Sequence, residues 1–185
     1  MRTFLASLWI LVAACLTGGA AGASTSGSDT QHAIRDAQLN RDHDPCRRIR
    51  LADSRWRRTT MTPTLAAVLQ LAEKFARLDN AIEHGAILYR RPDGTIRTGP
   101  IIAGDGNSVL LTVSPLPAEL IVAAVHTHAR YPYYTVDQSR LSVEDIALGT
   151  QLLALPHTDR RLLLYIIDNA TQTLNEYSAS GRCAR

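Results

Sequence analysis

The run LIVAAVHTH, residues 120–128, constrains the fold of this chain more than any other feature. Its first six letters are all apolar, whereas a half-buried strand would alternate apolar and polar residues. A run of this length without alternation predicts a strand that is buried on both faces. The rest of the chain must therefore provide structure on both sides of the sheet that contains it.

The segments around this run predict further strands and two helices. Residues 62–81 carry apolar side chains at helical spacing after a Thr-Pro start, and residues 142–155 predict a second helix. HGAILYRRPDGTIRTGPII predicts two strands around the turn RPDG, and NSVLLTV, RRLLLYIID and LNEYSA predict three more. This order predicts an α/β (α+β) fold, in which helices sandwich a mixed β-sheet in a single domain.

Residues 1–23 have the pattern of an export signal. Arg2 is followed by FLASLWILVAAC, an apolar run too short for a permanent membrane span, and then by small residues. Two processing routes stay open: cleavage before Ser24 would release the protein, whereas lipid attachment at Cys15 in VAAC would leave it anchored. We therefore expect an exported protein, periplasmic or secreted, whose only contact with a membrane would be that lipid.

Residues 24–61 are polar and basic and lack periodicity, so we expect a flexible N-terminal arm before a domain at 62–185. Once the leader is processed, Cys46 and Cys183 form an even pair in an oxidising compartment, which predicts a disulfide between the arm and the C-terminus. The net charge is +3 and Lys74 is the only lysine. We attribute this arginine-rich balance to compositional bias and predict no nucleic-acid partner; the sequence does not indicate an oligomeric state.

His126 and His128 stand at the end of the buried strand. Residues i and i+2 of a strand share a face, so both imidazoles point one way and Thr127 points the other. Two imidazoles at the mouth of an apolar strand are typical of a zinc site. Ser142 and Asp145 begin the next helix, and two interpretations stay open: the pair forms an N-terminal capping box, or it brings a carboxylate and a hydroxyl to the metal.

Two histidines, one aspartate and a position left for water are the arrangement of a catalytic zinc. Such a site needs a general base, usually a carboxylate that does not bind the metal. Glu83 is the candidate, because it lies where the first helix gives way to a strand and Gly85 follows closely. The alternative is an exposed surface glutamate. Other His-x-His enzymes fit less well, since His157, the only later histidine, lies in a predicted loop.

Together these residues resemble the JAMM (MPN+) metallopeptidase signature, Glu…His-x-His…Ser-x-x-Asp, over about residues 62–177. The stretch EHGAILYRRPDGTIRTGP is also similar to a bacterial JAMM-related family of uncharacterised domains, found in secreted and polymorphic-toxin-type proteins. The resemblance implies that His126, His128 and Asp145 hold Zn²⁺. It implies that Glu83 passes a proton from water to the leaving amine, and that Ser142 stabilises the oxyanion. The expected reaction is hydrolysis of a peptide or isopeptide bond in a peptide or protein substrate.

The loop between His128 and Ser142 departs from the JAMM pattern. Ala129 stands where these proteins usually have proline, and the gap is longer than usual. We expect the tyrosines of this loop to form an aromatic wall of the substrate groove; they are Tyr131, Tyr133 and Tyr134. The alternative function is a catalytically inactive JAMM-like binding module, or a toxin-associated envelope module in which zinc is only structural.

Overall fold

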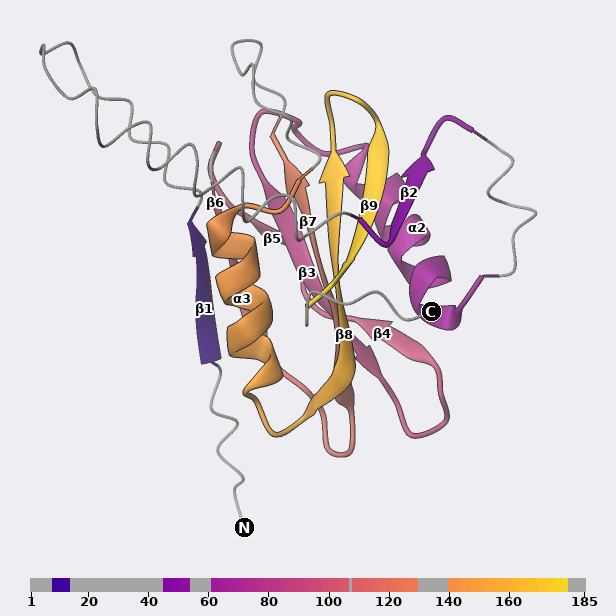
Figure 1. The fold of residues 1–185 in the computed structure, drawn as a ribbon, viewed down its shortest axis with the longest axis vertical. Coiled ribbons are helices and arrows are strands. Elements are labelled where there is room, and N and C mark those ends of the chain that lie inside the picture. The colour runs from indigo at the N-terminus through magenta and orange to yellow at the C-terminus, as the bar shows by residue number, and fades with distance from the viewer. Residues whose placement is uncertain (1–7, 14–44, 54–60, 107, 130–139, 180–185) are drawn as a thin grey trace, which may run out of the picture.

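The computed structural model describes residues 8–13, 45–53, 61–106, 108–129 and 140–179 (Figure 1). Its main element is a seven-stranded mixed sheet in the order β2-β9-β8-β7-β3-β4, with β5 paired to β3. Only β7 and β8 are parallel, and the other neighbours in this sheet are antiparallel. The strands are β2 (Arg47–Arg50), β3 (His84–Arg90), β4 (Ile96–Thr98), β5 (Ile102–Ala103), β7 (Leu120–His128), β8 (Thr158–Asp168) and β9 (Thr173–Ser178).

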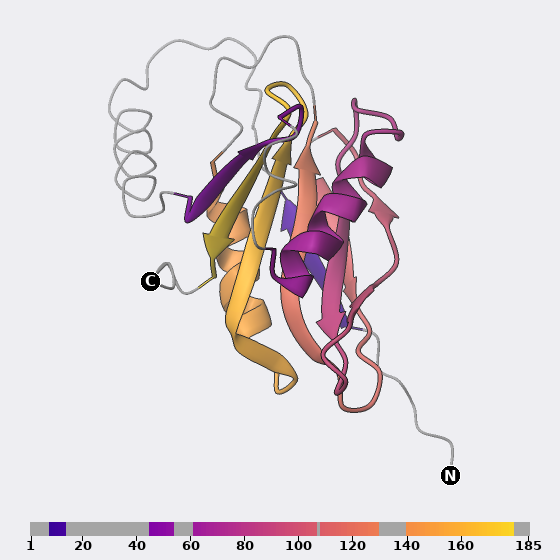
Figure 2. The same ribbon diagram turned by 90° about the vertical axis from the view of Figure 1, so that its right-hand side faces the viewer.

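Two helices cover opposite faces of this sheet, α2 (Pro63–Phe75) and α3 (Val143–Leu153) (Figure 2). Leu148 and Leu152 of α3 pack in one core with Ile166 of β8. The α2 side chains pack in a second core with Ile167, the next residue of β8. Since neighbouring residues of a strand point to opposite faces, the two cores lie on the two sides of the sheet. The predicted α+β class with a mixed sheet between helices is confirmed.

The start of α2 follows from its first residues. Thr62 is the N-cap, and its hydroxyl accepts a hydrogen bond from the Leu65 N–H at 3.2 Å. Pro63 occupies the first helical turn, where its missing N–H costs nothing. The helix then buries one apolar stripe against the sheet, composed of Leu65, Val68, Leu69, Leu71, Ala72 and Phe75.

The predicted burial of β7 on both faces is confirmed. All residues from position 121 to 127 are buried, and β7 lies between β8 and β3 in the sheet. Val125 belongs to the core under α2, whereas Ala124 belongs to the core under α3. The alternation continues to the end of the strand, so His126 and His128 point to the α3 side and Thr127 to the α2 side.

Four residues of the expected flexible arm, residues 24–61, lie in the main sheet. Arg47–Arg50 are strand β2, which pairs with β9 at the edge of the main sheet. Ile49 packs against the core under α2, and the Arg48 Nε donates a hydrogen bond to the buried Asn175 Oδ1 at 2.8 Å. With one apolar residue in four, RRIR has no strand pattern of its own, and its pairing depends on the open edge of β9. Residues 24–44 and 54–60 lie outside the described part of the chain.

The structure also differs from the expectation that residues 1–23 stay outside the fold. Leu8–Ala13 form strand β1, which pairs antiparallel with β6 (Ser108–Val113) in a separate two-stranded sheet. This apolar segment thus provides hydrogen-bond partners for the backbone groups at one edge of β6. Removal of this segment by processing stays a prediction. Within the described residues, no helix has the length and apolar character needed to cross a membrane.

Candidate metal centre

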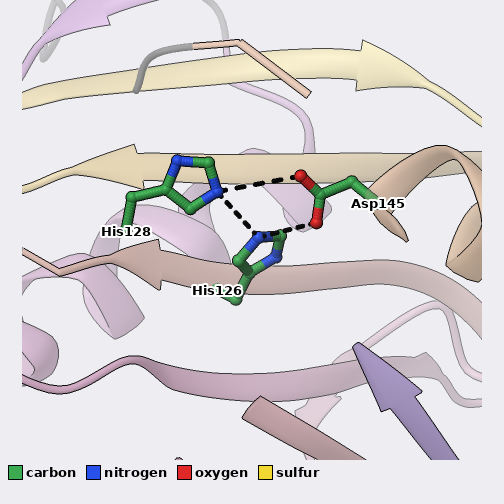
Figure 3. A group of neighbouring side chains, drawn as sticks. All are labelled: His126, His128 and Asp145. Atoms are coloured by element: carbon green, nitrogen blue, oxygen red, sulfur yellow. Dashed lines mark hydrogen bonds and ion pairs between the residues drawn. The ribbon is translucent and has the colours of Figure 1, made fainter. Parts of the chain in front are cut away.

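Three side chains converge where β7 ends and α3 begins (Figure 3). The Nε2 atoms of His126 and His128 are 3.2 Å apart. The Asp145 carboxylate approaches from the first turn of α3, with Oδ1 at 2.9 Å from His126 Nε2 and Oδ2 at 3.7 Å from His128 Nε2. Each residue can offer one ligand atom such that all three atoms lie within 4.8 Å of one another. The structure therefore brings together the three predicted ligands.

These distances suit a tetrahedral zinc ion. Zinc binds imidazole nitrogen and carboxylate oxygen at about 2.0–2.2 Å, which places neighbouring ligand atoms about 3.3–3.5 Å apart. The separations between the ligand atoms lie on both sides of that range. Asp145 Oδ1 is buried and has no hydrogen-bond partner in the described residues, although His126 Nε2 is 2.9 Å away. The His126 and Asp145 side chains are therefore in close contact at this point.

Ser142 and Asp145 form a complete capping box, so the first interpretation of their spacing is confirmed, while the second, contact with a metal, stays a prediction. The Ser142 Oγ accepts a hydrogen bond from the Asp145 N–H at 3.1 Å, and Asp145 Oδ2 accepts one from the Ser142 N–H at 2.7 Å. The cap therefore fixes Oδ2 and leaves Oδ1 turned toward His126 (Figure 3). The hydrogen bonds that cap the helix thus also orient the carboxylate of Asp145, a predicted ligand.

The electrostatics of the cluster favour an ionised aspartate. Asp145 is only 1% exposed. Burial acts to raise its pKa, but charge attraction and hydrogen bonding from His126 and His128 outweigh burial and hold the pKa below the usual range of an aspartate. Asp145 therefore carries the negative charge that a metal ligand needs.

Glu83 lies beside the three ligands and is 5% exposed, which excludes the alternative of a surface glutamate. It precedes β3 and shares the strand face of Gly85, whose ladder partner is His126. Burial raises the pKa of Glu83; the charges of His126 and His128 oppose this shift, and that of Asp145 adds to it. The Glu83 carboxyl thus interacts electrostatically with all three predicted ligands but is not part of their cluster.

A turn that the sequence analysis missed holds the backbone of Glu83. The Glu83 N–H donates to the Asp105 carbonyl at 2.7 Å, and the Glu83 carbonyl accepts from the Gly104 N–H at 2.8 Å. A Cβ atom on Gly104 would lie 1.8 Å from the Ser108 carbonyl oxygen, so the close approach of the two backbones requires glycine here. The glycine-rich letters AGDG, residues 103–106, indicate a turn, but nothing in them identifies Glu83 as its contact.

Some predicted residues fall outside the described part of the chain. The loop tyrosines and Cys183 belong to this group, so the aromatic wall and the Cys46–Cys183 disulfide stay predictions. Cys46 directly precedes β2, and its N–H donates to the Glu176 carbonyl of β9 at 2.7 Å. Ala129, which replaces the usual proline of the resemblance, is buried at the end of β7.

Comparisons with protein-family models, with curated proteins and with solved structures find no match to this chain. The resemblance to JAMM proteins therefore depends on the five motif residues and on their arrangement in space.

Proposed function

We propose that this protein is a zinc-dependent hydrolase of the JAMM type, which cleaves a peptide or isopeptide amide bond. The observation that carries the proposal is the meeting of His126, His128 and Asp145 at one point, with the buried carboxyl of Glu83 beside them. Two imidazoles and a carboxylate are a common protein ligand set of hydrolytic zinc.

The composition of the cluster favours a catalytic site over a structural one. A structural zinc is closed by four protein ligands, whereas a catalytic zinc has three and leaves a position open. In the parts of the chain that the structure describes, no fourth histidine, cysteine or acidic residue joins the cluster. Glu83 is close enough to interact electrostatically but stands outside the ligand group, as a general base should.

A bound Zn²⁺ would polarise the substrate carbonyl and make water acidic enough to lose a proton near neutral pH. Glu83 is placed to accept that proton. Its raised pKa brings the carboxyl closer to the working pH, so it can take the proton from water and later release it to the leaving amine. Its burial also excludes bulk water, which would otherwise compete for the proton.

Ser142 is suited to donate a hydrogen bond to the developing oxyanion. Its Oγ serves the capping box as an acceptor, from the Asp145 N–H. A hydroxyl has one donor and two acceptor positions, so this cap does not use the O–H proton. That proton can stabilise negative charge on the carbonyl oxygen, as donors in an oxyanion hole do.

The expected site of action follows from the leader and not from the metal centre. An exported protein, released or lipid-anchored at Cys15, would meet amides of the cell envelope or of secreted proteins. We therefore propose a peptide or protein substrate, and peptidoglycan peptides belong in the first substrate screen. No nucleic acid is part of this proposal.

Paired variants of the mature protein test the assignment. Glu83→Gln keeps the shape of the side chain but removes the base, so we expect zinc content equal to wild type and a rate lower by about 10²- to 10⁴-fold. His126→Ala removes a ligand, so we expect zinc to be lost or much weakened together with activity. Glu144→Gln, next to Asp145 on α3, is the matched control for loss of one negative charge, and it should change neither zinc content nor rate.

The measurements are zinc per chain by elemental analysis and the rate of hydrolysis on peptide and peptidoglycan substrates. A Glu83→Gln variant that loses zinc would show that Glu83 is a ligand and that the assigned roles are wrong. A wild-type protein that binds zinc at His126, His128 and Asp145 but cleaves nothing in the screen would favour the alternative, an inactive JAMM-like binding module.

A further inference from the structure

Thr127 lies between the two predicted histidine ligands but faces away from them. It is 1% exposed and points to the α2 side of the sheet. Its hydroxyl oxygen accepts a hydrogen bond from the backbone N–H of His84 at 2.9 Å, and this bond is buried. The bond joins the strand that carries the metal ligands to the residue that directly follows Glu83.

This hydroxyl continues a backbone ladder that would otherwise stop. The paired positions of β3 and β7 end with Gly85 and His126. One residue further, the His84 N–H points to β7 and finds the Thr127 side chain in place of a carbonyl. A buried N–H needs a hydrogen-bond acceptor, and the Thr127 hydroxyl provides one for the His84 N–H where no backbone carbonyl of β7 does. The His84 ring packs near Phe75 of α2, with ring centroids 6.1 Å apart, on the same side of the sheet.

The peptide unit between Glu83 and His84 is therefore held from two directions. The turn at Gly104 and Asp105 bonds the Glu83 carbonyl and N–H, and Thr127 bonds the His84 N–H. Neighbouring residues of an extended chain point to opposite faces, so fixing His84 toward α2 turns the Glu83 side chain toward the metal side. These backbone hydrogen bonds at Glu83 and His84 therefore direct the Glu83 carboxyl.

We propose that Thr127 is a positioning residue, whose hydroxyl sets the Glu83 carboxylate on the opposite face of the sheet. The expected effect on kcat rests on the proposed hydrolytic function. The expected effect on the position of Glu83 does not. A displacement of about 1 Å in a catalytic group can cost about 10²-fold in rate. Thr127 touches neither substrate nor metal, so its effect must pass through His84 and Glu83.

The test compares two replacements of Thr127 in the mature, zinc-loaded protein. Thr127→Val keeps the branched shape and removes the acceptor, whereas Thr127→Ser keeps the acceptor and removes a methyl group. We expect Thr127→Val to lower kcat by about 10²-fold with KM and zinc content unchanged. Thr127→Ser should retain kcat within a few-fold. Thr158→Val is the matched control, because the buried Thr158 hydroxyl has no partner in the described residues, and it should leave kcat unchanged.

Amide hydrogen exchange at His84 reads the same bond without any substrate. Exchange of the His84 N–H should be faster in Thr127→Val than in wild type, and Thr127→Ser and Thr158→Val should match wild type. Equal His84 exchange in all four proteins would overturn the inference. Wild-type kcat in Thr127→Val, or loss of zinc from that variant, would also overturn it. An equal fall of kcat in Thr127→Val and Thr127→Ser would do the same. If wild type hydrolyses nothing, the proposed function fails, and the exchange rates alone decide whether Thr127 holds the strand of Glu83.

Discussion

Replacing Gly104 with alanine should reduce catalysis without removing the metal. The new Cβ would lie 1.8 Å from the Ser108 carbonyl oxygen and 2.8 Å from the Val109 Cα. Backbone atoms cannot approach a Cβ more closely than about 3 Å, so the turn must move by about 1 Å or more. The Gly104 N–H donates a hydrogen bond to the Glu83 carbonyl, so this movement would displace Glu83, the proposed base.

The size of the effect follows from that displacement. Overpacking of this kind costs about 1–3 kcal/mol of unfolding free energy. A 1 Å displacement of the base should lower kcat by about 10²-fold. Zinc content should equal that of wild type, because no ligand belongs to the turn. Urea unfolding, elemental analysis and steady-state kinetics on the same preparation give the three quantities.

Gly94→Ala provides the matched control. Gly94 lies in the β3–β4 turn with a φ of 82°, and a Cβ there would meet nothing within 4 Å. Its cost is backbone strain alone, about 1–2 kcal/mol. The two variants should therefore lose similar stability, while only Gly104→Ala loses kcat. Wild-type kcat in Gly104→Ala would refute the role of this turn, and equal loss of kcat in both variants would attribute the effect to stability.

Three further predictions concern stability and the residues that the structure does not describe. Burial raises the pKa of Glu83, so its charge costs stability above the unfolded pKa; Glu83→Gln should raise the Tm of the zinc-free protein at pH 7, and the gain should vanish near pH ~3, below the ordinary glutamate value of about 4.3. A Tm at pH 7 no higher than wild type would contradict this sign. Thiol titration of the denatured, non-reduced mature chain should find no free thiol, and two thiols would exclude the Cys46–Cys183 bond. Replacement of the three loop tyrosines, Tyr131, Tyr133 and Tyr134, with alanine should raise KM with little change in Tm. A large fall in Tm would indicate that they pack in the core.

The sequence was informative where the deciding interactions are local. Ser142 and Asp145 are three residues apart, and both the capping box and the direction of the carboxylate follow from that spacing once a helix forms. The unbroken apolar run at residues 120–125 predicted a buried strand, because a strand that faces water on one side would alternate apolar and polar residues. The faces of His126 and His128 then followed from strand alternation alone.

The sequence was less informative where a partner far along the chain decides. RRIR becomes β2 because β9 has an open edge, and nothing in those four letters encodes that edge. The hydrogen bonds of Gly104 and Asp105 to Glu83 are likewise a tertiary contact, between two backbone segments whose sequences do not identify each other as partners. Backbone groups are the same in every residue, so sequence patterns do not identify which of them will meet.

The positions of the site residues along the chain determine whether zinc content is a good measure of the active fraction of a preparation. His126 and His128 belong to β7 and Asp145 to α3, the next element along the chain, whereas Glu83 lies near them because of the antiparallel pairing of β3 with β7. Closing the short loop costs less chain entropy than bringing β3 into register. If the proposed roles hold, partly folded molecules would bind zinc through His126, His128 and Asp145 while Glu83 is not yet in place, and bound zinc would then overestimate the active fraction. We expect native-state hydrogen exchange to show β3 opening at lower free energy than the β7–α3 unit; the reverse order would contradict this expectation.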